Sequence, residues 1–351
     1  MATAPNAPAS PLSPLSDSRL ARVRRAGAGQ GWILRRLGLG VVTMAVVSVI
    51  IFLATQVLPG DPARKILGPD SGEAQIEALR DRLGLDDPLL TQFANWAGGA
   101  LTGDFGESYL GRPVGAMVGQ ALANTLSLVS IVIVLAVILS LFIGVRAASR
   151  RDGPFDHAVV FVSLVLTAIP DFVIAIGLVL LFATAVLQVL PAVAMLPEGA
   201  SAFTQPKAIA LPVITLTLGV VAYLSRHIRA SMIDVLESDY IQMARNKGLR
   251  PRTILWRHAL PNAITPTIQA VAFALAHLIA GVITVEFVYG YPGVGTLFVN
   301  AVGSRDLPVI QGLALVFAAT WVILNLVVDI LTVYVDPRLR TSARRGAGVA
   351  R

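Results

Sequence analysis

The feature that most constrains this chain is a series of long apolar segments with few charged residues. A helix needs about 20 apolar residues to cross the roughly 30 Å hydrocarbon core of a bilayer. Segments of that length occur at residues 33–58, 125–147, 157–190, 207–225, 264–288 and 309–335. Because backbone polar groups in a bilayer must be satisfied internally, such segments cross as helices. The sequence therefore predicts an all-α integral membrane protein with six transmembrane helices.

The composition agrees with this class and argues against others. Hydrophobic residues make up 55% of the 351 residues, charged residues only 14%, and the mean hydropathy is +0.72, values outside the range of soluble globular domains. The net charge of +7 comes from basic residues beside the apolar segments, so no nucleic-acid partner is predicted. With no Cys, and four His without ligand spacing, we predict no metal site. No Ser has a nucleophile context, so no catalytic residue and no enzyme is predicted.

The third apolar segment, residues 157–190, is longer than one span requires. It contains Ile169, Pro170 and Asp171, and a proline inside a helix removes a backbone hydrogen bond. We therefore expect this span to be kinked or partly unwound there. Dividing it would give seven spans, but no polar loop separates the halves, so six are retained.

The distribution of Lys and Arg predicts the orientation. Most of the 28 basic residues lie in the N-terminal tail, near residues 146–151, within 226–257, and after residue 337. The side rich in Lys and Arg is the cytoplasmic one, so both termini are expected inside. Residues 1–31 are predicted to be a disordered basic tail and residues 341–351 a C-terminal tail. The first span, residues 32–58, is too long for a cleaved signal peptide.

The long extracytoplasmic loop, residues 59–124, is predicted to contain structure of its own. Apolar residues at helical spacing precede Gly84, which can end a first helix, and Pro88 can open a second. Such a small helical cap suits either contact with a soluble partner or a lid packed over the spans.

A basic insert between the fourth and fifth spans, residues 239–262, reads as two short helices. The first is expected to stop at Gly248, and Pro251 can open the second, which we expect to end at Leu260 and Pro261. Short amphipathic helices with exposed basic residues suit the groove of a partner protein. No GxxxxGK[ST] loop occurs, so energy from ATP would come from another subunit.

Ionisable residues inside the spans are candidates for function because burying them in a bilayer is costly. Asp171 and Glu286 are candidates for positions in a pathway or gate. Each also has a structural interpretation. Asp171 follows the proline and can satisfy freed backbone amides, and Glu286 can bond the N–H groups of the turn that follows it. Asp329 lies near a cytoplasmic helix end, where a structural role is favoured.

Sequence motifs along nearly the whole chain resemble one family. They are LPGDP at 58–62, LGLDDPLLTQF at 83–93, GDFGES at 103–108, ARNKGL at 244–249, RHALPNAITP at 257–266, EFVYGYPGVG at 286–295, DLPVIQG at 306–312 and NLVVDILTVYVDPRLR at 325–340. Together they resemble the permease subunits of ABC importers of the dipeptide, oligopeptide and nickel class. Their order is similar to that of the first of the two paired permeases.

This resemblance implies a type I ABC importer transmembrane domain over residues 125–340, with a cytoplasmic coupling loop at 237–261. The broader importer pattern has a Glu-Ala-Ala triplet before a Gly, and only the last Ala is kept here. The implied contacts with the ATPase are Tyr240, Ala244, Lys247, Gly248, Pro251, Leu260 and Pro261.

The resemblance also implies a set of partners in a bacterial inner membrane. They are a second, homologous permease, two cytoplasmic ATPase subunits that bind ATP and Mg, and an extracytoplasmic binding protein. This chain itself is expected to hold no cofactor and to form half of a pathway for di- or oligopeptides. Modified peptides and nickel chelates also fit. A self-sufficient channel or secondary transporter is the alternative, but it would not need the basic insert and would show internal repeats.

Overall fold

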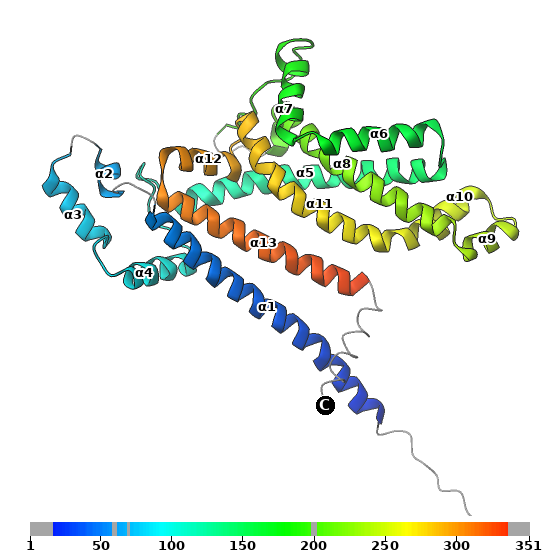
Figure 1. Ribbon diagram of the computed structural model, residues 1–351, viewed down its shortest axis with the longest axis horizontal. Coiled ribbons are helices and arrows are strands. Elements are labelled where there is room, and N and C mark those ends of the chain that lie inside the picture. Colours follow the sequence, from blue (N-terminus) through cyan, green and yellow to red (C-terminus); the bar gives the residue numbers. More distant parts are fainter. Residues whose placement is uncertain (1–16, 58–61, 69–70, 198–201, 336–351) are drawn as a thin grey trace, which may run out of the picture.

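The computed structural model describes residues 17–57, 62–68, 71–197 and 202–335 of the chain (Figure 1). Within these ranges the regular structure is helical, apart from one isolated bridge between Glu107 and Pro113. The elements in chain order are α1 (Asp17–Val57), α2 (Pro62–Leu67), α3 (Glu73–Leu83), α4 (Leu89–Thr102), α5 (Val114–Ser149), α6 (Pro154–Ala168), α7 (Asp171–Val179), the π-helix η1 (Leu180–Thr184), the 3₁₀-helix η2 (Ala202–Thr204), α8 (Pro206–Leu236), α9 (Asp239–Asn246), α10 (Pro251–Thr253), the π-helix η3 (Ile254–Ala259), α11 (Leu260–Tyr289), α12 (Val294–Ser304) and α13 (Leu307–Val335).

The described residues contain five helices long and apolar enough to cross a membrane, in α1, α5, α8, α11 and α13. A sixth span exists if α6 and α7 count as one, although the chain bends by 102° between them. Ile169 takes an extended conformation there (φ −91°, ψ 129°), as expected of a residue before proline. The break that the sequence predicts at Pro170 is therefore confirmed, and it is a sharp turn rather than a mild kink.

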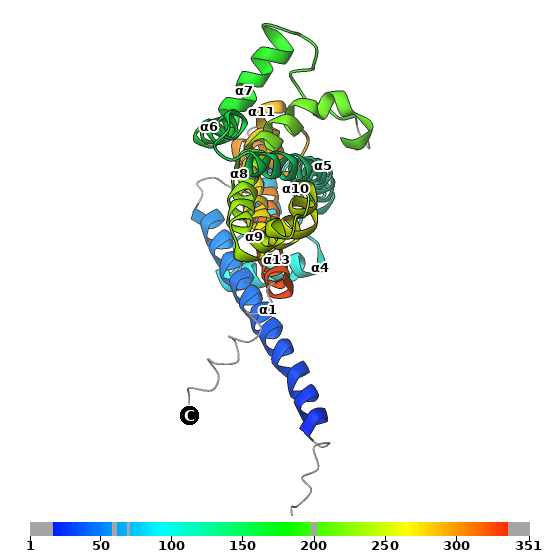
Figure 2. The same cartoon turned by 90° about the vertical axis from the view of Figure 1, so that its right-hand side faces the viewer.

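Helix α8 is the centre of the bundle. It packs against α5, α11, α6 and α7, and 61% of its most apolar window is buried, compared with 6% for α1 and 11% for α13. Viewed along the bundle, α5, α8 and α11 cluster together while α1 and α13 lie to one side (Figure 2). Arg36 of α1 forms an ion pair with Asp329 of α13, which joins the two outer helices.

Polar contacts fasten α6 to α8 along its length. Arg229 donates to both carboxylate oxygens of Asp156, one of them at 2.6 Å, and Asp156 is 1% exposed. Ser163 and Ser225 approach to 3.5 Å. Near the C-terminal end of α8, Arg151 pairs with Glu237. These contacts hold α6 and α8 together as far as the end of α8.

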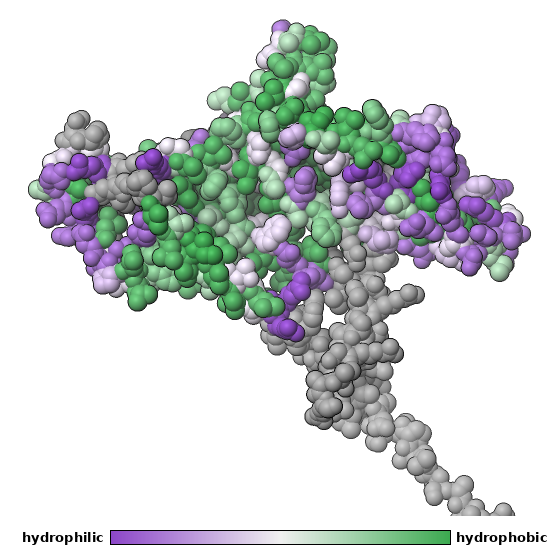
Figure 3. All heavy atoms as spheres, viewed as in Figure 1, coloured by the Kyte–Doolittle hydropathy of each residue, from purple (hydrophilic) through white to green (hydrophobic). Residues whose placement is uncertain are grey.

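The apolar surface forms a band between two polar ends. Figure 3 shows hydrophobic residues over the middle of the molecule, with hydrophilic residues over α2 and α3 at one end and over α9 and α10 at the other. This distribution fits a bundle whose middle lies in hydrocarbon and whose ends lie in water.

Several helices extend beyond the predicted limits. Helix α1 begins at Asp17 and so covers residues 17–31 of the predicted tail, α5 begins at Val114 rather than residue 125, and α8 continues to Leu236. Hydropathy marks where a helix meets hydrocarbon, but the backbone hydrogen bonds continue into water until a residue stops them. The first four residues of the LPGDP motif (58–61) and the tails at 1–16 and 336–351 lie outside the described residues.

The two helices predicted within residues 59–124 are confirmed. Helix α3 ends at Gly84, which adopts a left-handed conformation (φ 63°), and α4 follows Pro88. Phe93 and Trp96 of α4 stack against Phe52 of α1, with ring centroids 5.4 Å and 5.8 Å from that of Phe52. Helix α4 is therefore packed onto the first span.

Candidate functional site

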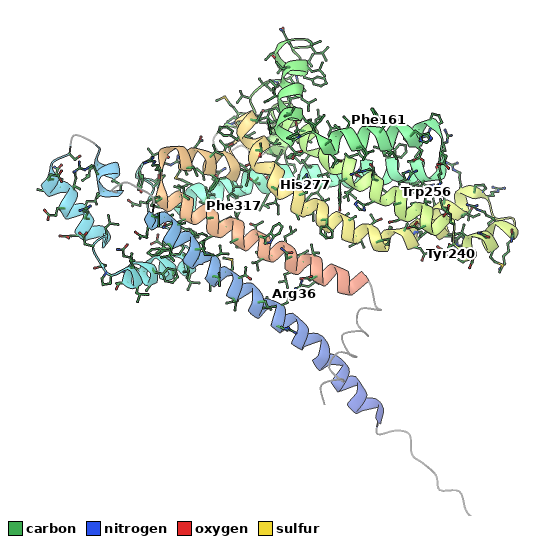
Figure 4. All side chains as sticks on the ribbon, in the orientation of Figure 1. Arg36, Phe161, Tyr240, Trp256, His277 and Phe317 are labelled. Atoms are coloured by element: carbon green, nitrogen blue, oxygen red, sulfur yellow. The ribbon has the colours of Figure 1, made fainter. Side chains whose placement is uncertain are left out.

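The basic insert forms a compact knob, made of α9, α10 and η3, at one polar end of the bundle. Ile241 and Ala244 of α9 are buried and belong to the same apolar core as Ile254 of η3. The other side of the knob is exposed, and Figure 4 labels Tyr240 and Trp256 at this end of the molecule. One face thus anchors the knob to the bundle and leaves the other for a partner.

Gly248 makes the turn between the two helical parts of the knob. Its φ is +77°, and no heavy atom lies within 4 Å of the position that a Cβ would take. The Gly248 N–H donates to the Arg245 carbonyl at 2.9 Å, and the Leu249 N–H donates to that of Ala244 at 3.3 Å. The stop predicted at Gly248 is confirmed, and only glycine adopts this backbone without strain.

The second part of the knob differs from the prediction. Pro251 opens α10 as expected, but the helix does not end at Leu260 and Pro261. Instead η3 leads without a break into α11, which carries Pro261 in its first turn. The π-helical turn just before Pro261 changes the local backbone hydrogen-bond pattern, which accommodates the missing N–H of the proline.

The residues named from the family pattern divide into two groups. Tyr240, Lys247, Gly248, Pro251 and Pro261 are exposed on the knob. Leu260 is half-buried, and Ala244 is only 9% exposed and faces the bundle.

Two exposed apolar side chains on the knob were not predicted from the sequence. Met243 is 58% exposed and Trp256 is 51% exposed, beside Tyr240 at 46%. Large apolar residues that face water at the polar end of a membrane protein mark an interaction surface. The sequence could have indicated both residues, because each lies away from the buried face of its short helix.

Asp171 lies at the start of α7, where the chain bends. A Cβ on Gly219 of α8 would lie 3.3 Å from its Oδ1, and one on Gly281 of α11 would lie 2.5 Å from its Oδ2. The carboxylate therefore occupies a notch formed by two glycines on neighbouring helices. Asp171 is half-buried.

Glu286 is fully buried and braces the turn that joins α11 to α12. Its carboxylate accepts a hydrogen bond from the Thr125 hydroxyl at 2.6 Å and from the Gly295 N–H at 2.7 Å. The Thr125 hydroxyl oxygen in turn accepts from the Val294 N–H at 3.0 Å. The bonding to turn N–H groups expected from the sequence is present, and Glu286 connects α5, α11 and α12.

Tyr291 supports the same turn from outside the span. Its hydroxyl donates to the Asn124 carbonyl at 2.7 Å, and the Asn124 side chain donates to the Pro292 carbonyl at 2.8 Å. Burial, together with the nearby Glu286 charge, raises the pKa of the Tyr291 hydroxyl above its usual value. The hydroxyl therefore stays protonated and remains a donor.

Replacing Thr125 with Val is expected to destabilise the protein by about 1–3 kcal/mol, because it leaves the buried Glu286 carboxylate and the Val294 N–H short of a partner. Thermal unfolding in detergent measures the loss. Thr43→Val is the matched control, since the exposed Thr43 hydroxyl bonds only the Leu39 carbonyl of its own helix. Equal melting temperatures for the two variants would contradict the bracing role.

The fold and the knob together define a class: a multi-span membrane component with a basic segment for a partner at one end. Among the described residues, no group of three or more His, Cys, Asp or Glu residues could hold a metal. Residues 140–341 match the family described as the binding-protein-dependent transport system inner membrane component, and residues 30–141 match the N-terminal model of such membrane components. The chain belongs to this family of inner-membrane permease subunits, and it is a transporter component rather than an enzyme.

The relatives of the chain carry consistent names. A probable peptide ABC transporter permease of Sinorhizobium fredii is 37% identical over 315 residues, which cover 88% of this chain and 99% of the relative. The glutathione transport system permease of Escherichia coli K12 is 37% identical over 311 residues, covering 88% and 98%. A putative peptide transport system permease of Brucella abortus is 34% identical over 309 residues, covering 88% and 98%.

Proposed function

We propose that this chain forms half of the pathway of an ATP-driven importer of short peptides, together with a second, homologous permease. Two cytoplasmic ATPase subunits would bind ATP and Mg, and an extracytoplasmic binding protein would deliver the peptide. The observation that carries the proposal is the knob of α9, α10 and η3, which exposes Tyr240, Met243 and Trp256 at a polar end of the bundle. A channel working alone has no use for such a surface.

The choice of peptides rests on the similar proteins. Two of the relatives are named as peptide permeases, and the third is named for glutathione, which is itself a tripeptide. Nickel chelates, which the wider class also transports, find no such support. We assign the substrate to short peptides on this basis.

The proposed contact with the ATPase is the exposed side of the knob. Tyr240, Lys247, Gly248 and Pro251 would meet the ATPase groove, with Met243 and Trp256 added as apolar anchors. Ala244 and Leu260, which are buried or half-buried, would hold the knob in shape from behind, and the exposed Pro261 would join the contact. Closure of the ATPase pair on ATP would draw the knobs of the two permeases together, and the spans would rock to open the pathway outward.

The proposed topology places both termini in the cytoplasm. A reporter fused after Arg340 is expected inside and one inserted near Ser71 outside, because most Lys and Arg residues lie on the side of the knob. Alkaline phosphatase and green fluorescent protein fusions measure the two sides. Finding both positions on one side would contradict six spans.

Reconstitution tests the proposed function directly. The chain purified with its partner permease and ATPase subunits is expected to hydrolyse ATP faster when peptide-loaded binding protein is added, and to move labelled peptide into liposomes. The chain alone is expected to hydrolyse none, since it has no phosphate-binding loop. Peptide uptake by the chain without ATPase subunits would favour a self-sufficient transporter.

A further inference from the structure

A strip of polar side chains along α8 and α11 has no role in the knob or in the Glu286 brace. Its upper end is the notch where the Asp171 carboxylate meets Gly219 and Gly281. Helix α8 runs toward the knob and α11 runs away from it, so the two helices are antiparallel. Residues one turn closer to the knob are therefore later in α8 and earlier in α11.

Helical spacing places further polar side chains below the notch. Tyr223 lies four residues after Gly219, and His277 lies four residues before Gly281, so each shares a face with its glycine, one turn nearer the knob. His227 follows on α8, and its ring centroid lies 4.4 Å from that of Tyr223. Figure 4 labels His277 in the middle of the bundle.

These side chains are accessible, although they lie within membrane spans. His277 and His227 are exposed, and Tyr223 and Asp171 are half-buried. On α5, by contrast, the exposed face carries Val134, Ile138 and Phe142, which are all apolar. Ionisable side chains are costly against lipid, so this polar strip faces water or another protein surface, while the α5 face suits hydrocarbon.

Asp171 is also a carboxylate without a partner. In the part of the chain that the structure describes, its side chain makes no hydrogen bond or ion pair. Asp156, Glu286 and Asp329 each have one, with Arg229, Thr125 and Arg36 respectively. Within the described helices Asp234 also has none, but it is exposed near the knob end of α8. A half-exposed carboxylate with no internal cation is suited to an external one.

We propose that this polar strip lines the substrate pathway and that the Asp171 carboxylate binds the N-terminal ammonium group of a passing peptide. The inference rests on the proposed function and adds the chemical group that is recognised. The two glycines leave room for the Asp171 carboxylate between α8 and α11, and because Asp171 is only half-buried there, its exposed side can meet the ammonium group. The Tyr223 ring one turn below offers an aromatic surface to the peptide.

The cysteine-free sequence makes a direct test simple. His277→Cys is placed in the full assembly and treated with a cationic or an anionic methanethiosulfonate of equal size, and modification of this chain is read as a gel shift. We expect Cys at 277 to react, with the cation faster by about fivefold, the ratio that a unit charge one turn away produces in water. Ile138→Cys on the apolar face of α5 is the control and is expected to stay unreactive.

Substitution of Asp171 separates charge from structure. Adding Asp171→Asn is expected to bring the cation-to-anion ratio near one, and Asp171→Glu is expected to keep the preference. Labelling of His277→Cys no faster than that of Ile138→Cys, or a ratio unchanged by Asp171→Asn, would overturn the proposal. Stimulation of ATP hydrolysis by the loaded binding protein is measured in the same samples, so failure of the importer assignment is recognised separately.

Peptide protection identifies the recognised group. Millimolar trialanine is expected to slow cationic modification at position 277, whereas N-acetyl-trialanine, which lacks the ammonium group, is expected to have no effect. Equal protection by both peptides, or protection by neither, would overturn the assignment of Asp171 to the peptide amino terminus.

Discussion

Replacing Gly248 with Trp is expected to leave the chain in the membrane and to abolish peptide uptake. The residue has a φ of +77°, which costs a residue with a Cβ roughly 1–2 kcal/mol. The space around it is open, so the indole would project from the exposed side of the knob, where the ATPase is proposed to dock. Both effects fall on the knob and neither touches a span. Co-purification of the ATPase subunits and uptake of labelled peptide measure the outcome.

Gly103 provides the matched control for this experiment. It ends α4 in the same left-handed conformation, with a φ of +83° and no heavy atom within 4 Å of a Cβ position, but at the opposite end of the bundle. Gly103→Trp is expected to leave ATPase co-purification unchanged. If Gly248→Trp also retains the ATPase subunits and uptake, Gly248 only ends a helix and the contact lies elsewhere on the knob.

Asp156→Ala is expected to destabilise the chain by about 3–5 kcal/mol, because it leaves the Arg229 guanidinium mostly buried without its carboxylate. Loss of folded protein and a lower melting temperature in detergent measure the effect. Replacing both residues with apolar ones of similar volume, as in Asp156→Leu with Arg229→Met, is expected to recover most of the stability. A double variant as unstable as the single one would contradict this account.

The control is the exposed pair formed by Arg151 and Glu237. Their side chains are 48% and 63% exposed, and surface pairs of this kind contribute about 0–1 kcal/mol. Glu237→Ala is therefore expected to change the melting temperature little. A loss equal to that of Asp156→Ala would mean that burial is not what distinguishes the two pairs.

The spans were predictable because the length of an apolar run is set by the bilayer itself. Pro170 likewise indicated a break, because a proline removes a backbone hydrogen bond from a helix, although α8 continues through Pro212 and α11 through Pro266. The helix ends at Gly84 and Gly248 could be predicted from the residue type alone, and both glycines have a positive φ in the structure. Local chemistry decided all of these features.

Features that depend on tertiary contacts could not be predicted from the sequence. Whether the Ala244 side chain is buried or exposed depends on where η3 packs. The continuation of the helix through Pro261 depends on a π-helical turn that no residue type predicts. Helix α12, with 11 residues, is too short for a span and was not predicted. The notch around Asp171 joins α7, α8 and α11, and a single sequence carries no sign of that meeting.

Because η3 continues into α11 without a break, a rotation of the knob would also tilt α11. Gly281 lies 21 residues beyond Leu260, a distance of about 32 Å at 1.5 Å per residue. A tilt of about 5° at the base would therefore move Gly281 sideways by about 3 Å, the size of a hydrogen bond. Helix α8 enters the knob from the other side, separated from α9 by only Glu237 and Ser238. Small rotations imposed on the knob would thus be amplified at the notch, which widens or narrows with the angle between the two helices.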